Sequence, residues 1–108
     1  MKTTLRLFIG LAGLSLASLG YAQTVGNAEA AKGKIAMCIG CHGIEDYRTA
    51  YPEVYSVPKI GGQSPQYILK ALHAYGSGER SHPSMRAIAR GLTEQDMADL
   101  AAYYGREK

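Results

Sequence analysis

Two cysteines and a histidine stand together in the run Cys38-Ile39-Gly40-Cys41-His42. The thiols are three positions apart, so they can lie on the same face of a helix. The histidine that follows at once places an imidazole beside them, where a ring nitrogen can bind a metal. This C-x-x-C-H spacing is typical of covalent haem attachment, in which two thiols reach two vinyl groups and the imidazole lies under the iron. Cys38 and Cys41 are therefore the candidate thioether residues for one haem c, and His42 is the candidate iron ligand.

Three other uses of a thiol pair compete with haem attachment. A disulfide oxidoreductase also uses C-x-x-C, but such motifs usually lie in an α/β unit, and the sequence contains no strand-like run. A zinc site needs four ligands, so His73 or His82 would have to join the motif, at a separation that does not match a zinc finger. A structural disulfide in an exported chain is the third alternative. The adjacent histidine favours haem over all three.

Haem iron has a second axial position, and five residues are candidates for it: Met37, Met85, Met97, His73 and His82. Met37 adjoins the first thiol on the wrong side of the ring, Met97 falls in an apolar helical stripe, and His73 lies on a polar helix face. Met85 stands in a loop bounded by glycine and proline, far enough along the chain to wrap around the haem. His82 is the second candidate. A thioether ligand would raise the reduction potential of the iron and close it to small molecules.

The chain has 108 residues and a formal charge of +3. Its beginning predicts an export signal, because Lys2 and Arg6 precede an apolar run that ends at the small-x-small sequence Gly20-Tyr21-Ala22. The run is shorter than the roughly 20 residues that span a bilayer, and an uncleaved anchor is the alternative. We expect cleavage of residues 1–22, a periplasmic location and one domain over 23–108. The lysines are scattered, so we expect no nucleic-acid binding. Once the short apolar run is removed, we expect no stable membrane insertion.

Helix signals recur along the mature chain and strand signals do not, so the expected fold class is all-α. Asn27, Ser64 and Thr93 are the expected N-caps. Apolar residues at helical spacing predict three main helices, over about 27–39, 64–76 and 93–105. The first would end at the cysteines, with the histidine just beyond it. Residues 43–63 are expected to form a loop carrying three tyrosines, and residues 84–90 a helical turn.

The motif and four further runs resemble the class I c-type cytochromes, in particular the bacterial cytochrome c553 and cytochrome c4 group. These runs are PKIGGQSPQY from Pro58, GER from Gly78, MRAIA from Met85 and LTEQDMADLAAYY from Leu92. The resemblance implies the class I cytochrome c fold, with loops wrapped around one covalent haem, and one-electron transfer as the function. It also implies that Met85 is the axial thioether and that Pro58 offers its carbonyl oxygen to the ring of His42.

The chain departs from the family pattern where the first and last helices cross. Ala31 stands where relatives often carry glycine, and Gly33 follows two positions later, which allows a shifted crossing. The family pattern places Tyr103 at the crossing, whereas the apolar stripe favours Tyr104. We follow the family pattern at this position.

The function expected from these residues is that of a periplasmic one-electron carrier. We recognise no catalytic site, so an enzyme is not expected. The partners would be a redox donor and acceptor, such as membrane respiratory complexes or periplasmic oxidoreductases. The alternative is a haem-bearing subunit docked to a larger redox enzyme. A gas sensor or peroxidase needs an open iron position, which Met85 would close, and a structural haem without a redox partner is the remaining class.

Overall fold

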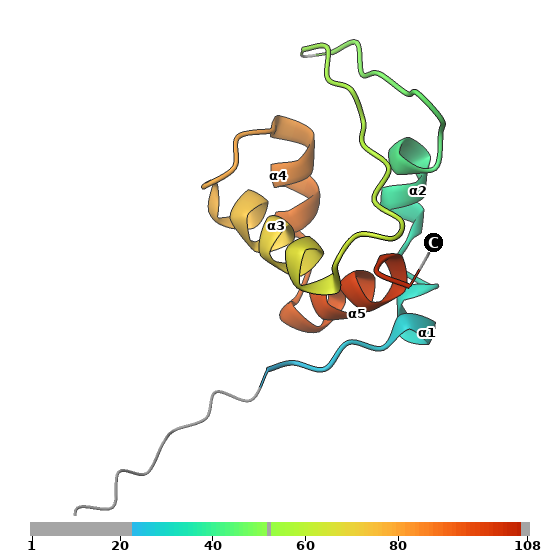
Figure 1. The fold of residues 1–108 in the computed structure, drawn as a ribbon. Helices are drawn as coiled ribbons and strands as arrows, with labels where there is room; N and C mark the ends of the chain where they lie inside the picture. The colour runs from blue at the N-terminus through green and yellow to red at the C-terminus, as the bar shows by residue number, and fades with distance from the viewer. Residues whose placement is uncertain (1–22, 52, 107–108) are drawn as a thin grey trace, which may run out of the picture.

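The computed structural model describes residues 23–51 and 53–106, and within these ranges the regular structure is helical (Figure 1). The helices are α1 (Ala28–Ala31), α2 (Ala36–His42), α3 (Pro65–Ser77), α4 (Pro83–Arg90) and α5 (Glu94–Tyr104). In the described part, β pairing is limited to an isolated bridge between Arg48 and Ser56. The expected export signal, residues 1–22, lies outside the described residues. None of the described helices is long and apolar enough to cross a membrane.

The first predicted helix is broken, so the expectation of one continuous helix over 27–39 is wrong. Asn27 caps α1 as expected, accepting from the backbone N–H groups of Glu29 and Ala30. The chain then tightens, because the N–H of Lys34 donates to the carbonyl of Ala31 instead of continuing the α-helical pattern. Gly33 in this turn is a poor helix former. Helix α2 restarts at residue 36 and includes the whole C-x-x-C-H motif, so the histidine lies in its last turn and not beyond it.

Helices α3 and α5 begin where the sequence predicts. The Ser64 side chain accepts from the N–H of Tyr67 to cap α3, and Thr93 forms a capping box with Asp96 at the start of α5. Helix α3 runs to Ser77, past the predicted end at Gly76, and Gly78 caps it in the left-handed conformation that closes a helix (φ 90°). The predicted turn at 84–90 is a two-turn helix, α4, and it contains Met85.

The core lies where α5 packs against α1 and α3. Its buried members are Ala31, Ile68, Leu72, Met97, Leu100, Ala101 and Tyr104. Helix α3 also packs against α4, so α4 is held to the core through α3. In Figure 1 the loop after α2 runs back along α2 to reach the start of α3. This arrangement places α2 and α4 on opposite sides of one apolar region, which the next section describes.

The close approach of the N-terminal segment to α5 occurs at Gly26, and not at Gly33. A Cβ atom on Gly26 would overlap the carbonyl oxygen of Ala98, whereas one on Gly33 would meet nothing from α5. Tyr103 and Tyr104 contact different parts of the structure. Tyr104 is buried in the core, and Tyr103 lies beside the residues of α1 while its ring packs edge-on against Tyr104.

Candidate functional site

The two thiols lie on α2, and each is half-buried. Cys38 packs against the core, and its burial raises the pKa of the thiol; a contact with Tyr104 offsets only part of this. A redox-active C-x-x-C cysteine needs the opposite, a lowered thiol pKa that supplies thiolate near neutral pH. The surroundings of Cys38 therefore disfavour the disulfide oxidoreductase alternative. The two cysteines are also free in the structure and form no structural disulfide.

The imidazole of His42 is held by the loop that precedes α3. Its Nδ1 lies 2.7 Å from the carbonyl oxygen of Pro58. A carbonyl oxygen can only accept, so Nδ1 carries the proton and donates. The neutral ring then has its lone pair on Nε2, the atom left available for a metal. Hydrogen bonding of this kind fixes the tautomer and the ring orientation of a metal-binding histidine and makes the ring a stronger ligand.

An apolar cleft joins the motif on α2 to Met85 on α4. It is lined by Met37, Cys38, His42, Ile60, Ile68, Leu72, Met85, Ile88, Leu92, Leu100 and Tyr104. The wall thus contains a thiol of the motif, the imidazole, the thioethers of Met37 and Met85 and the phenol of Tyr104, and the rest of it is aliphatic. A flat apolar macrocycle with an iron at its centre needs this set: thiols for covalent attachment, two axial donors and a dry wall. The residues present fit a haem.

The placement of Met85 differs from the sequence prediction in one respect. We expected a loop residue, but Met85 is in the first turn of α4, half-buried and packed against the core. Its backbone N–H donates to Nδ1 of His82, 3.2 Å away, so the imidazole of His82 is the N-cap of α4. The signal for this helix is His82-Pro83, which repeats the cap-then-proline pattern of Ser64-Pro65. This cap-then-proline pattern is the sequence signal that predicts a helix beginning at Pro83.

The other ligand candidates have different surroundings. Met97 is 7% exposed and belongs to the core cluster. His73 is half-exposed, and its Nε2 lies 2.9 Å from a carboxylate oxygen of Glu94. His82 accepts through Nδ1, so in the neutral ring its Nε2 carries the proton and has no free lone pair. Met37 lines the cleft, but its side chain is half exposed next to the first thiol.

Zinc binding finds no support among the described residues. Within 23–51 and 53–106, no three side chains of His, Cys, Asp or Glu gather where they could hold a metal ion. The two histidines that a zinc site would recruit are engaged elsewhere, by Glu94 and by the N-terminus of α4. Haem therefore remains the cofactor that the geometry favours.

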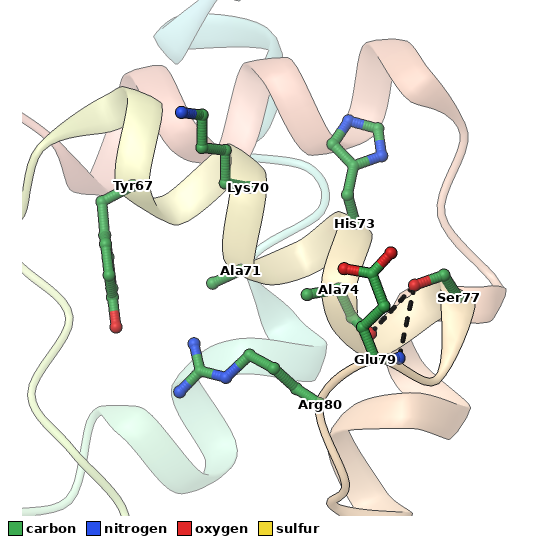
Figure 2. Close-up of a pocket in the computed structure, with 8 residues that line it drawn as sticks. All are labelled: Tyr67, Lys70, Ala71, His73, Ala74, Ser77, Glu79 and Arg80. Carbon is green, nitrogen blue, oxygen red and sulfur yellow. Dashed lines mark hydrogen bonds between the residues drawn. The ribbon is translucent and has the colours of Figure 1, made fainter.

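A wider groove of about 590 Å³ lies on another face of α3. Figure 2 shows its lining: Lys70 and His73 extend from one side of α3, and Arg80 lies on the other side next to Ala71 and Ala74. The hydroxyl of Ser77 bridges the carbonyl of Ala74 and the N–H of Glu79. None of the motif residues lines this groove, nor does Met85, so it is separate from the cleft.

Comparison with known proteins decides the family. The sequence model of the family described as cytochrome c matches residues 28–104. The chain belongs to the cytochrome c family. Cytochrome c4 of Pseudomonas aeruginosa is 36% identical over 95 residues, which are 88% of this chain and 45% of that protein. Cytochrome c-554(548) of Halomonas halodenitrificans is 36% identical over 86 residues, covering 77% of this chain and 99% of that protein. The crystal structure of reduced recombinant cytochrome c4 from Pseudomonas stutzeri superposes with a TM-score of 0.63, at 33% identity, over 78% of this chain and 47% of that one.

The matches cover different shares of the relatives' lengths, and they confirm the fold class and the family predicted from the sequence. The chain spans about half the length of the cytochrome c4 relatives and nearly all of cytochrome c-554(548). The class I all-α fold expected from the sequence is confirmed, and so is the resemblance to the cytochrome c4 group. The cofactor of this cytochrome c domain is haem c, on the motif that contains Cys38 and Cys41.

Proposed function

We propose that this chain is a one-electron carrier whose haem c iron is bound by His42 and Met85. The observation that carries the proposal is that these two side chains line the same apolar cleft from different helices. The imidazole has its Nε2 lone pair available because Nδ1 donates to Pro58. The thioether of Met85 is the remaining uncommitted donor from the far wall. The haem, when bound, supplies the iron that cycles between ferrous and ferric.

Each part of the chain would contribute to this function in a definite way. The carbonyl of Pro58 orients His42 and increases the electron density on Nε2. The thioether of Met85 favours the reduced state relative to a second imidazole and blocks small molecules. Ile68, Leu72 and Leu100 exclude water from the cleft. A dry surrounding of low dielectric stabilises the iron form of lower net charge and raises the potential further.

The expected setting is the periplasm, with redox proteins as donor and acceptor. The basic residues, apolar run and small-x-small site in residues 1–22 support export and cleavage after Ala22. If His42 and Met85 both bind the iron, no position would stay open for a substrate, which would support a carrier over an enzyme, a gas sensor or a peroxidase.

A second candidate function is that of a haem subunit docked to a larger redox enzyme. The observation that favours it is apolar exposure next to the motif: Ile39 is 51% exposed and Ile44 is 50% exposed. Against it, the same rim carries a solvent-exposed pair between Lys59 and Glu45, which is typical of a wetted surface. We favour the free carrier. Sedimentation of the protein in an extract of its native cells separates the two, because a docked subunit migrates with its partner.

The test of the carrier is a potentiometric titration combined with carbon monoxide exposure of the ferrous protein. A carrier with two axial side chains gives one reversible one-electron transition, and its ferrous spectrum does not change under carbon monoxide. A rapid carbon monoxide complex at neutral pH would show an open iron and would replace the carrier with a ligand-binding or catalytic haem.

A further inference from the structure

The N-terminus of α4 is capped by a side chain that is rarely used for this purpose. Ser, Thr, Asp and Asn are the usual N-cap residues, because their short side chains reach the N–H groups of the first turn. Here the residue is His82, whose Nδ1 accepts from the N–H of Met85 at 3.2 Å. The cap bond therefore ends on the residue that we propose as the iron ligand. An imidazole is larger and more rigid than a serine hydroxyl, so its placement needs support from its neighbours.

That support comes from two aromatic rings on different segments. The ring of Tyr55 lies 4.0 Å from the ring of His82, centroid to centroid, at an interplanar angle of 43°. The ring of Tyr75, on α3, meets it edge-on at 6.3 Å, and the guanidinium of Arg80 lies 4.6 Å above the Tyr75 ring. All three rings are half-buried. His82 is thus enclosed by the loop on one side and by α3 on the other.

The segment that carries Tyr55 is itself organised as a small hairpin. The N–H of Thr49 donates to the carbonyl of Tyr55, and the N–H of Val57 donates to the carbonyl of Tyr47. The hydroxyl of Thr49 donates to the carbonyl of Glu53 and accepts from the N–H of Tyr55. The phenol of Tyr55 donates to a carboxylate oxygen of Glu53 at 2.8 Å. These bonds fix Tyr55 relative to the loop. The loop therefore presents the Tyr55 ring to His82 in a defined position.

We propose that His82 is a positioning residue for Met85, and that the hairpin carrying Tyr55 holds His82 in place. The inference rests on the proposed role of Met85 as an iron ligand. Fixing the N–H of Met85 fixes the start of α4, and the start of α4 sets where the thioether enters the cleft. The hairpin then acts on the iron through two contacts, Tyr55 on His82 and His82 on Met85. This gives the tyrosine loop a function in the haem site, although it contributes no ligand.

The test measures how often Met85 leaves the iron, using the rate of cyanide binding to the ferric holoprotein. Cyanide binds only after the thioether leaves, so loss of the cap in His82→Ala should raise the rate about tenfold, the scale of a lost N-cap. His82→Asn keeps a cap-forming oxygen and should return the rate to within about twofold of wild type. The matched control is Ser64→Ala. Ser64 caps α3 with the same spacing and the same 3.2 Å bond, also ahead of a proline, but its bond ends on Tyr67. This control should lose comparable stability and leave the cyanide rate unchanged.

A pair of Tyr55 variants tests whether the hairpin holds His82 in place. These variants also keep the proposal testable if His82→Ala does not fold. Tyr55→Phe keeps the ring and the backbone bonds of the hairpin and loses only the exposed bond to Glu53, so its cyanide rate should stay within about twofold of wild type. Tyr55→Ala should raise the cyanide rate severalfold. The proposal is overturned if His82→Ala or Tyr55→Ala binds cyanide at the wild-type rate, if His82→Asn fails to rescue, or if Ser64→Ala accelerates binding equally. Failure of the underlying assignment looks different. If Met85 is not the ligand, either the wild-type ferric protein lacks the near-infrared sulfur–iron band or Met85→Ala keeps it, whatever the His82 variants do.

Discussion

Replacing Asp99 with asparagine should destabilise the protein by about 2 kcal/mol at neutral pH. Asp99 is 1% exposed, and its buried carboxylate accepts three hydrogen bonds. One oxygen accepts from the N–H of Asn27 at 2.7 Å and from the amide of Gln95 at 2.8 Å, and the other from the ammonium of Lys34 at 2.8 Å. This clasp ties the N-terminal segment and the turn before α2 to α5. It therefore sets where the cysteine-bearing helix begins.

The magnitude follows from which of these bonds asparagine can keep. Its carbonyl oxygen can still accept from Asn27 and Gln95, but an NH₂ group replaces the oxygen that faces Lys34. The loss is one hydrogen bond to a charged group in a buried setting, which typically contributes about 1.5–3 kcal/mol. The ammonium of Lys34 keeps its second partner, Asp96, at 2.6 Å, so it is not left unpaired. We therefore expect the lower half of that range.

The effect should depend on pH in a defined direction. The neighbouring Lys34 ammonium, followed by the N–H of Asn27, holds the pKa of Asp99 below its usual range. Because the pKa in the folded state is lower than the unfolded value of about 3.9, the ionised carboxylate stabilises the fold above that value. The contribution is lost as pH falls through the folded pKa. The gap between wild type and Asp99→Asn should be constant from pH 7 to pH 5 and should narrow below about pH 4.

Urea unfolding of the holoprotein, followed by far-ultraviolet circular dichroism, measures this gap. The matched control is Glu29→Gln, which removes a carboxylate from an exposed pair with Lys32 and should give no measurable change. Equal midpoints for wild type and Asp99→Asn at pH 7, or a gap that widens in acid, would show that the clasp does not stabilise the fold through its charge.

Three further outcomes are expected. Intact mass of protein matured with the cytochrome c assembly machinery should exceed the bare chain by one haem that acid acetone does not extract, and Cys41→Ala should retain one thioether; extractable haem would contradict covalent attachment. Gly26→Ala should lower the free energy of unfolding in urea by about 1–3 kcal/mol, because its Cβ would overlap the carbonyl of Ala98. Gly33→Ala should leave the free energy of unfolding nearly unchanged. A larger loss for Gly33→Ala than for Gly26→Ala would place the crossing at Gly33. Haem-free protein should lack a cooperative thermal transition by circular dichroism, because a group bound only by the native state adds its binding free energy to stability; a sharp transition with full helical signal would contradict a core built around the haem.

Sequence reasoning succeeded where the signal is local. The spacing of Cys38, Cys41 and His42 is a property of one helical turn, and Asn27, Ser64 and Thr93 cap helices through bonds to residues two or three positions away. Such signals can be read within a window of a few residues. The fold class and the cofactor followed from them.

The features that could not be predicted from the sequence depend on contacts with residues far away along the chain. The break between α1 and α2 coincides with Lys34, whose partners Asp96 and Asp99 come more than 60 positions later. The contact that requires Gly26 lies on α5, at Ala98. The sequence makes His82 a candidate iron ligand, but its role at the start of α4 depends on rings from the hairpin and from α3. No local periodicity encodes these contacts.

The central claim is that Met85 is the axial ligand opposite His42, and the near-infrared absorption of the ferric protein tests it most directly. A weak sulfur–iron charge-transfer band accompanies thioether ligation. Wild type and Met97→Leu, a nearly volume-conserving change in the core, should both show the band. Met85→Ala should lose it, and its reduction potential should fall. A band that survives in Met85→Ala, or disappears in Met97→Leu, would contradict the assignment of Met85.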